Sequence, residues 1–96
     1  MTGKIRRLVL DTLKPLELSI VDMARQLSEL EGIGAVNISI VEIDHKVENA
    51  KITIEGDDIK HKVVFTFLED QGASIHSIDE VVAGRTIIDD AATLQD

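Results

Sequence analysis

Carboxylates offer the main chemistry available in this 96-residue sequence. They stand inside or directly after short apolar runs, and one histidine occurs in the last such run. Calcium and magnesium take several oxygen ligands, so two or three carboxylates, completed by water or by a neighbouring subunit, would suit them. The simpler alternative is that these residues are solvated at turns, cap a helix or pair with nearby basic residues. The candidate metal ligands are first Asp11, Asp44 and Asp79, and then Glu42, Asp57, Asp58 and His76.

Asp11 is the most informative candidate because it interrupts an otherwise apolar run, "LVLDTL". A buried carboxylate must be paired or coordinated. An interface that covered Asp11 would therefore require a partner for it, whereas a solvent-exposed sheet face would not.

Nucleophilic and cofactor-dependent catalysis find little support. Cysteine is absent, which excludes thiolate catalysis, zinc–thiolate sites and disulfides. His76 and Ser77 are neighbours in a predicted strand and should point to opposite faces, so they do not form a base–nucleophile pair. We find no glycine-rich phosphate or dinucleotide motif, and we assign no catalytic or cofactor-binding residue. The alternatives are a metal-assisted hydrolase that uses Asp11, Asp44 and His76, and a small-molecule sensor with its site between subunits.

Hydrophobic periodicity defines the elements that would position these side chains. Alternating apolar and polar residues predict four strands, and apolar residues at helical spacing predict two helices. The first helix should begin at Ser19 and end at Gly32, and the second should begin at Asp57 or Asp58 and end at Gly72. The predicted strands cover residues 4–13, 35–44, 50–56 and 73–79.

This βαββαβ order is the ferredoxin-like α+β plan. Right-handed crossovers place both helices on one face of an antiparallel sheet with strand order 4-1-3-2. The strand directions then gather side chains at two rims of the sheet. One rim collects Asp11, Glu42, Asp44 and His76, and the other collects Asp57, Asp58, Asp79 and Glu80 beside Lys4 and Arg6.

Composition narrows the classes of partner. The net charge of −8 disfavours nucleic acid, because proteins that bind it present a basic face. No run approaches the ~20 apolar residues of a membrane span. The start, "MTGKIRR", leads directly into a predicted strand, so we expect no signal peptide and a cytoplasmic location. Hydrophobic residues make up 44% of the chain, enough for a core, although a domain this small gains stability from oligomerisation.

Apolar residues are left over once the core is assigned. Val9, Val41 and Ile43 fall on the sheet face opposite the helices, and the segment "RTII" (85–88) follows the fourth strand. Large exposed apolar patches mark interfaces. We therefore expect one domain, with a core at 1–80 and a C-terminal arm at 81–96, that assembles as a homo-oligomer. Residues 85–88 should form an arm or short extra strand against the sheet or a neighbouring subunit.

Several blocks of the sequence together resemble a known family. The blocks are "RRLVLDTLKP", "LSELEGIGAVNISIVEID", "ENAKITIEGDDI" and "SIHSIDEVVAG". They are similar to a family of small, mostly archaeal proteins catalogued as domain of unknown function 211, and the similarity covers nearly the whole chain. The resemblance implies a ferredoxin-like fold, a cytoplasmic protein and a multi-subunit assembly, of which a ring is one form. It implies no enzymatic activity and transfers no catalytic residue.

Overall fold

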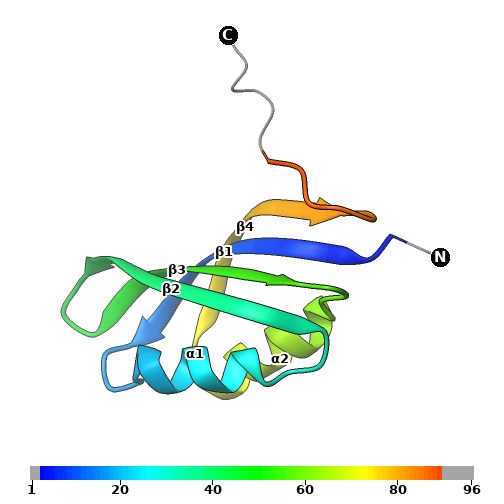
Figure 1. Ribbon diagram of the computed structural model, residues 1–96. Helices are drawn as coiled ribbons and strands as arrows, with labels where there is room; N and C mark the ends of the chain where they lie inside the picture. The colour runs from blue at the N-terminus through cyan, green and yellow to red at the C-terminus, as the bar shows by residue number, and fades with distance from the viewer. Residues whose placement is uncertain (1–2, 90–96) are drawn as a thin grey trace, which may run out of the picture.

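Four strands and two helices form over residues 3–89, the part of the chain that this computed structural model describes. Both helices lie on one face of the sheet (Figure 1). The sheet order is β2-β3-β1-β4 with every neighbouring pair antiparallel, which confirms the ferredoxin-like plan. The elements are β1 (Ile5–Pro15), α1 (Ile20–Ser28), β2 (Ile33–Ile43), β3 (Val47–Gly56), α2 (His61–Asp70) and β4 (Ser74–Ala83).

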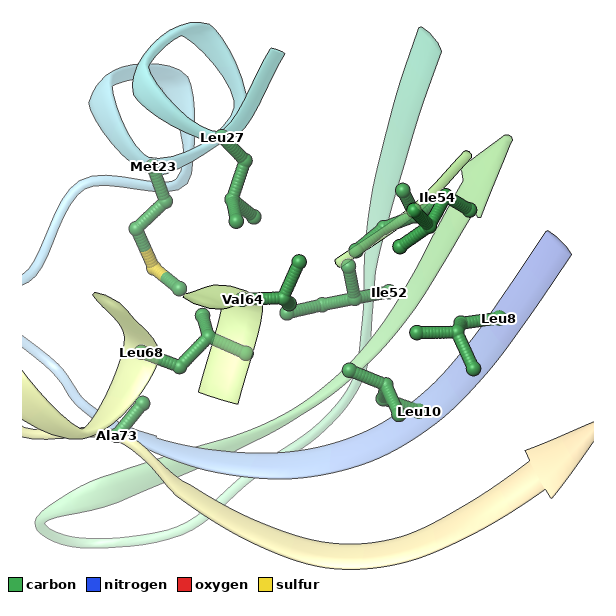
Figure 2. Packing of buried hydrophobic residues seen from close by; sticks show 10 residues of the cluster. Leu8, Leu10, Met23, Leu27, Ile52, Ile54, Val64, Leu68 and Ala73 are labelled. Atoms are coloured by element: carbon green, nitrogen blue, oxygen red, sulfur yellow. The ribbon is translucent and has the colours of Figure 1, made fainter. Parts of the chain in front are cut away.

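The core lies between the central strands and the two helices (Figure 2). Alternation in β1 turns Leu8 and Leu10 toward the helices, where their partners across the β1–β3 register are Ile54 and Ile52. Met23 and Leu27 of α1 and Val64 and Leu68 of α2 close the other side. Since the side-chain period of a strand is two, the opposite face of β1 carries Arg7, Val9 and Asp11. Val9 is only 7% exposed there, so the prediction that it adds exposed apolar surface is wrong.

Helix α1 begins as the sequence predicts. The Ser19 hydroxyl accepts hydrogen bonds from the backbone N–H groups of Val21 at 3.1 Å and Asp22 at 3.3 Å. These bonds satisfy two of the donors that the first helical turn leaves without an intrahelical partner. The helix ends earlier than predicted, at Ser28 with Glu29 as its C-cap, and Gly32 follows at φ 85° in the left-handed conformation that glycine tolerates.

The prediction that Asp57 or Asp58 caps α2 is wrong. The N-cap is Lys60, and no side chain bonds to the first turn. The preceding residues are held by other parts of the fold instead: the N–H of Ile59 donates to the carbonyl of Ile5 at 2.9 Å. With Ile59 held by this hydrogen bond, the first helical residue is His61. Gly72, at φ 92°, ends the helix as predicted.

Strand β4 is longer than predicted, because it continues beyond Asp79 to Ala83. Its pairing with β1 shifts between Val9 and Leu10 and again between Asp11 and Thr12. Such bulges add a residue to one strand and change the direction of nearby side chains.

Where we predicted an arm or a short extra strand at 85–88, no strand forms within this chain: after Gly84, at φ 129°, residues 85–89 have no regular structure. Contact of this segment with a neighbouring subunit stays a prediction. One end of this segment is held by Arg7, whose Nη1 donates to Asp89 Oδ1 at 3.0 Å. The remainder of the predicted arm, 90–96, lies outside the described residues. No helix in the described residues is long and apolar enough to cross a membrane.

Candidate functional site

A hollow of about 330 Å³ lies on the sheet face opposite the helices, at the end of the sheet that carries the β2–β3 hairpin. The hollow is lined by three segments that are distant in sequence: β1, β4 and the β2–β3 hairpin. This is the first of the two rims that the strand directions predict. Its lining consists of Asp11, Glu42, Asp44 and His76, together with Asn49 and the apolar Leu13 and Val47.

Asp11 has a protein partner inside this hollow. The side-chain Nδ2 of Asn49 donates to Asp11 Oδ1 at 2.6 Å and to the carbonyl of Thr12 at 3.1 Å. Asn49 can reach both because β1 and β3 place it opposite Leu13, one position from Thr12 and two from Asp11. The half-buried carboxylate is therefore satisfied by a neutral amide, which leaves its negative charge uncompensated by that contact.

The other acidic residues of the hollow are more exposed. Glu42 follows a register shift between Ile40 and Glu42 that sets it opposite Asn49. Asp44 lies at the hairpin, where its Oδ1 accepts the N–H of His45 at 2.6 Å. This local bond is typical of aspartate in turns and orients the carboxylate without neutralising it.

His76 lines the hollow, as the strand directions predict, and it lies in a bulge of β4 that the sequence did not indicate. Asp11 pairs with Ser77 and Thr12 pairs with Ile75, so His76 is the extra residue between them. Because the bulge adds His76 between Ile75 and Ser77, Ser77 pairs with Asp11 while Ile75 packs against the core, and His76 lines the same hollow as Asp11. The Ser77 hydroxyl donates to Asp79 Oδ1 at 2.8 Å, so it does not serve His76 as a nucleophile.

The remaining candidate ligands lie elsewhere. Asp57 is 3.6 Å from Arg6 Nη2, and Asp58 Oδ2 accepts Lys60 Nζ at 2.8 Å. The hydrogen bond from Lys60 holds the pKa of Asp58 below its usual value. Asp79 lines a second hollow, formed with the end of β4 and with Asp89. Asp57 and Asp58 thus form ion pairs with basic side chains and not the predicted helix cap.

Within residues 3–89, no group of three or more histidine, aspartate or glutamate side chains is close enough to hold a metal ion. Any cation at the hollow would therefore need ligands from water or from another subunit, as the sequence analysis allowed.

A buried ion pair close to the hollow was not predicted. The Lys14 side chain is only 1% exposed, pairs with Glu48 and donates from Nζ to the carbonyl of Pro15 at 2.8 Å. Lys14 continues the inward-facing series of Leu8, Leu10 and Thr12, so the period of β1 was the available signal. Lys14 therefore stabilises the strand end and does not present its charge to a ligand.

A second network of charges surrounds Arg7 at the opposite end of β1. Its Nε donates to Glu55 at 2.8 Å, and its Nη1 donates to Glu80 at 3.3 Å. With Asp89 as a third acceptor, these bonds raise the pKa of Arg7 above its ordinary value, chiefly through Glu55. The network joins β1, β3, β4 and the following segment, so its role is to hold those parts together.

Comparison with known proteins gives two similarities. A family described as uncharacterised ArCR, domain of unknown function 211 (DUF211), matches residues 6–96. The uncharacterized protein MJ0319 of Methanocaldococcus jannaschii is 51% identical over 92 residues, which cover 96% of this chain and 95% of that protein. Neither description names an activity, a ligand or a partner.

Proposed function

This chain belongs to the DUF211 family, and from that starting point we propose that it acts as a homo-oligomeric, non-enzymatic module. The observation that carries the proposal is apolar surface exposed on regular strands. Val41 is 64% exposed and Ile43 66% exposed on β2, and Val81 is 53% exposed on β4. Exposed apolar patches of this kind are typical of surfaces that a partner covers.

The two strands that carry this apolar surface, β2 and β4, are the edge strands of the sheet. The order β2-β3-β1-β4 leaves β2 and β4 without a second neighbour within the described residues. An edge strand offers unpaired backbone N–H and C=O groups to another chain. Each edge also runs for ten residues or more, since β2 has 11 and β4 has 10. Assembly would cover apolar side chains and pair backbone groups at the same time.

A divalent cation, calcium or magnesium, is a refinement of this proposal. The hollow groups Asp11, Glu42 and Asp44 with His76, and assembly of like-charged subunits would bring further carboxylates close to one another. A cation would reduce that repulsion and would take its missing ligands from water or a neighbouring subunit. No feature of the described residues favours the hydrolase or sensor alternatives over this module. We also expect a cytoplasmic protein, in keeping with a sequence without cysteine.

Light scattering coupled to size-exclusion chromatography tests the assembly. We expect a mass of several chains at micromolar concentration. A clean monomer of 10.5 kDa under those conditions would refute the proposed function.

The cation is tested separately by thermal unfolding with calcium, with magnesium and with chelator. Bound cation stabilises the folded state by mass action, so the melting temperature should rise with the cation and fall with chelator. Asp44→Asn should reduce this shift, and Glu17→Gln, an exposed loop carboxylate outside the hollow, is the matched control. Identical melting curves with and without calcium and magnesium would remove the cation and leave the assembly untouched.

A further inference from the structure

The two ends of the domain each carry an exposed group of charged side chains. The β2–β3 hairpin projects at one end, and the start of β1 and the end of β4 lie at the other (Figure 1). The hairpin presents exposed Glu42 and Asp44, and their apolar neighbours Val41 and Ile43 are mostly exposed as well. The hairpin also carries exposed Lys46, so its two exposed carboxylates leave it net negative, with apolar neighbours.

The far end carries a basic hollow, lined by Lys4, Arg6, Gly84 and Arg85. Arg6 Nε is buried and makes no hydrogen bond within the described residues, and its Nη2 lies 3.6 Å from the exposed Asp57. A buried donor without an acceptor is uncommon in native structures and calls for an explanation. Lys4 and Arg85 add two positive charges that form no ion pair within residues 3–89. Within the described residues, its three cationic side chains form one ion pair, between Arg6 and Asp57, so the hollow lacks a second anionic partner.

The acidic hairpin of the same chain cannot supply that partner. The length of strand β1 separates the two ends. The N–H of Gly84 donates to the carbonyl of Lys4 beside the start of β1, and Val47 of the hairpin pairs with Pro15 at the end of β1. Eleven residues of strand cover about 35 Å at ~3.3 Å per residue. A second copy of the chain, however, can bring its hairpin to this hollow.

We infer that the hairpin carboxylates Glu42 and Asp44 of one subunit dock in the Lys4–Arg6–Arg85 hollow of the next, head to tail. The inference rests on the proposed assembly and specifies the two surfaces that meet. A contact between two different surfaces is heterologous, so it either closes into a ring or continues as a filament. Val41 and Ile43 would lose exposed apolar area in the contact, while the carboxylates give Arg6 and Arg85 their acceptors.

Two charge reversals test the contact from its two sides. Glu42→Lys alters the hairpin and Arg85→Glu alters the hollow, and both side chains are exposed, so circular dichroism should show an intact fold. Each variant should lose assembled mass in light scattering at concentrations where the unaltered protein assembles. Glu69→Lys on α2 and Arg25→Glu on α1 make the same charge changes on exposed helical positions outside both surfaces, and they should assemble normally.

An equimolar mixture of Glu42→Lys and Arg85→Glu provides the decisive measurement. Each variant keeps one unaltered surface, so the mixture should regain mass through the intact contact, and the reversed pair should restore the other contact. A cation bridge would not be rescued in this way, because the mixture replaces a carboxylate ligand with lysine.

Three outcomes separate the two proposals. If the unaltered protein is monomeric, the proposed function fails, and this inference fails with it. If the protein assembles but both reversed variants assemble equally well, only this inference is overturned. Calorimetry with inorganic phosphate gives the third outcome. If phosphate binds the unaltered protein, and Arg85→Glu abolishes that binding but assembles as the unaltered protein does, then a free anion occupies the hollow and this inference is overturned.

Discussion

The buried Lys14–Glu48 pair predicts that replacing both residues lowers the free energy of unfolding less than replacing Glu48 alone. The Lys14 side chain is 1% exposed and that of Glu48 is 18% exposed. Glu48→Gln keeps the shape of the partner but leaves a buried ammonium without a compensating charge. Breaking a buried pair from one side costs ~3–5 kcal/mol, whereas replacing both partners with well-packed hydrophobic residues of similar volume is often neutral or stabilising.

We expect Glu48→Gln to lower the free energy of unfolding by about 3 kcal/mol, at the low end of that range because the glutamine carbonyl can still accept from Lys14 Nζ. For a chain of this length, each kcal/mol lowers the melting temperature by roughly 4–8 °C, so the loss should be on the order of 15 °C. The double variant Lys14→Met with Glu48→Met replaces both partners with hydrophobic residues and should recover most of this loss.

Urea unfolding followed by circular dichroism measures the free energy of unfolding of the unaltered protein, the single variant and the double variant. Protein concentration must be the same for all variants, because assembly contributes to the apparent stability. Asp57→Asn is the control, since that side chain is 95% exposed and 3.6 Å from Arg6, a contact that should contribute less than ~1 kcal/mol. A loss below about 1 kcal/mol for Glu48→Gln, or a double variant less stable than the single one, would refute the reasoning.

Three further predictions concern local structure and charge. Ser19→Ala should reduce stability by about 1 kcal/mol in urea unfolding, because it removes the side-chain acceptor at the start of α1; an unchanged midpoint would contradict this. Gly32→Ala should lower the melting temperature far more than Gly34→Ala. A Cβ at position 32, where φ is 85°, would lie 2.1 Å from a backbone oxygen, whereas a Cβ at position 34 would be 3.6 Å from its nearest atom, an ordinary contact distance. Equal shifts would be inconsistent with this geometry. Lys60→Ala should raise the pKa of Asp58, which a carboxyl NMR titration measures. With the folded-state pKa of Asp58 lowered, its stabilisation is present above the unfolded pKa and disappears as pH falls through the folded one, so Lys60→Ala should narrow the stability difference between neutral and acidic pH; a pKa of Asp58 that does not move would exclude Lys60 as its cause.

Features that depend on short stretches of sequence were predictable. The period of two in β1 identified Leu8 and Leu10 as inward-facing, because successive side chains of a strand must alternate. The serine at position 19 and the glycine at 72 marked helix ends, because each supplies a local need of the backbone: a side-chain acceptor in one case and a left-handed conformation in the other. The order of these elements was then enough for the topology, since crossover handedness leaves few arrangements.

The candidate hollow was predictable in part, for the same reason. Strand directions alone place the end of β1, the β2–β3 hairpin and the start of β4 at one rim, so Asp11, Glu42, Asp44 and His76 were expected near one another. The bond from Asn49 to Asp11 was not, because it depends on the register between β1 and β3 and on the direction of one amide.

Tertiary structure decided the features that depend on contacts between distant segments. A bulge in the pairing of β4 with β1 adds His76 between Ile75 and Ser77, and the N–H of Ile59 bonds to the carbonyl of Ile5 just before α2 begins at His61. Lys14 is buried because Glu48, 34 residues away in sequence, supplies its counter-charge from the next strand. By itself, the sequence determined which side of each strand is apolar and where helices can begin or end, since those are local properties. The fold decided which charges meet, because pairing energies depend on distances that only the packed chain sets.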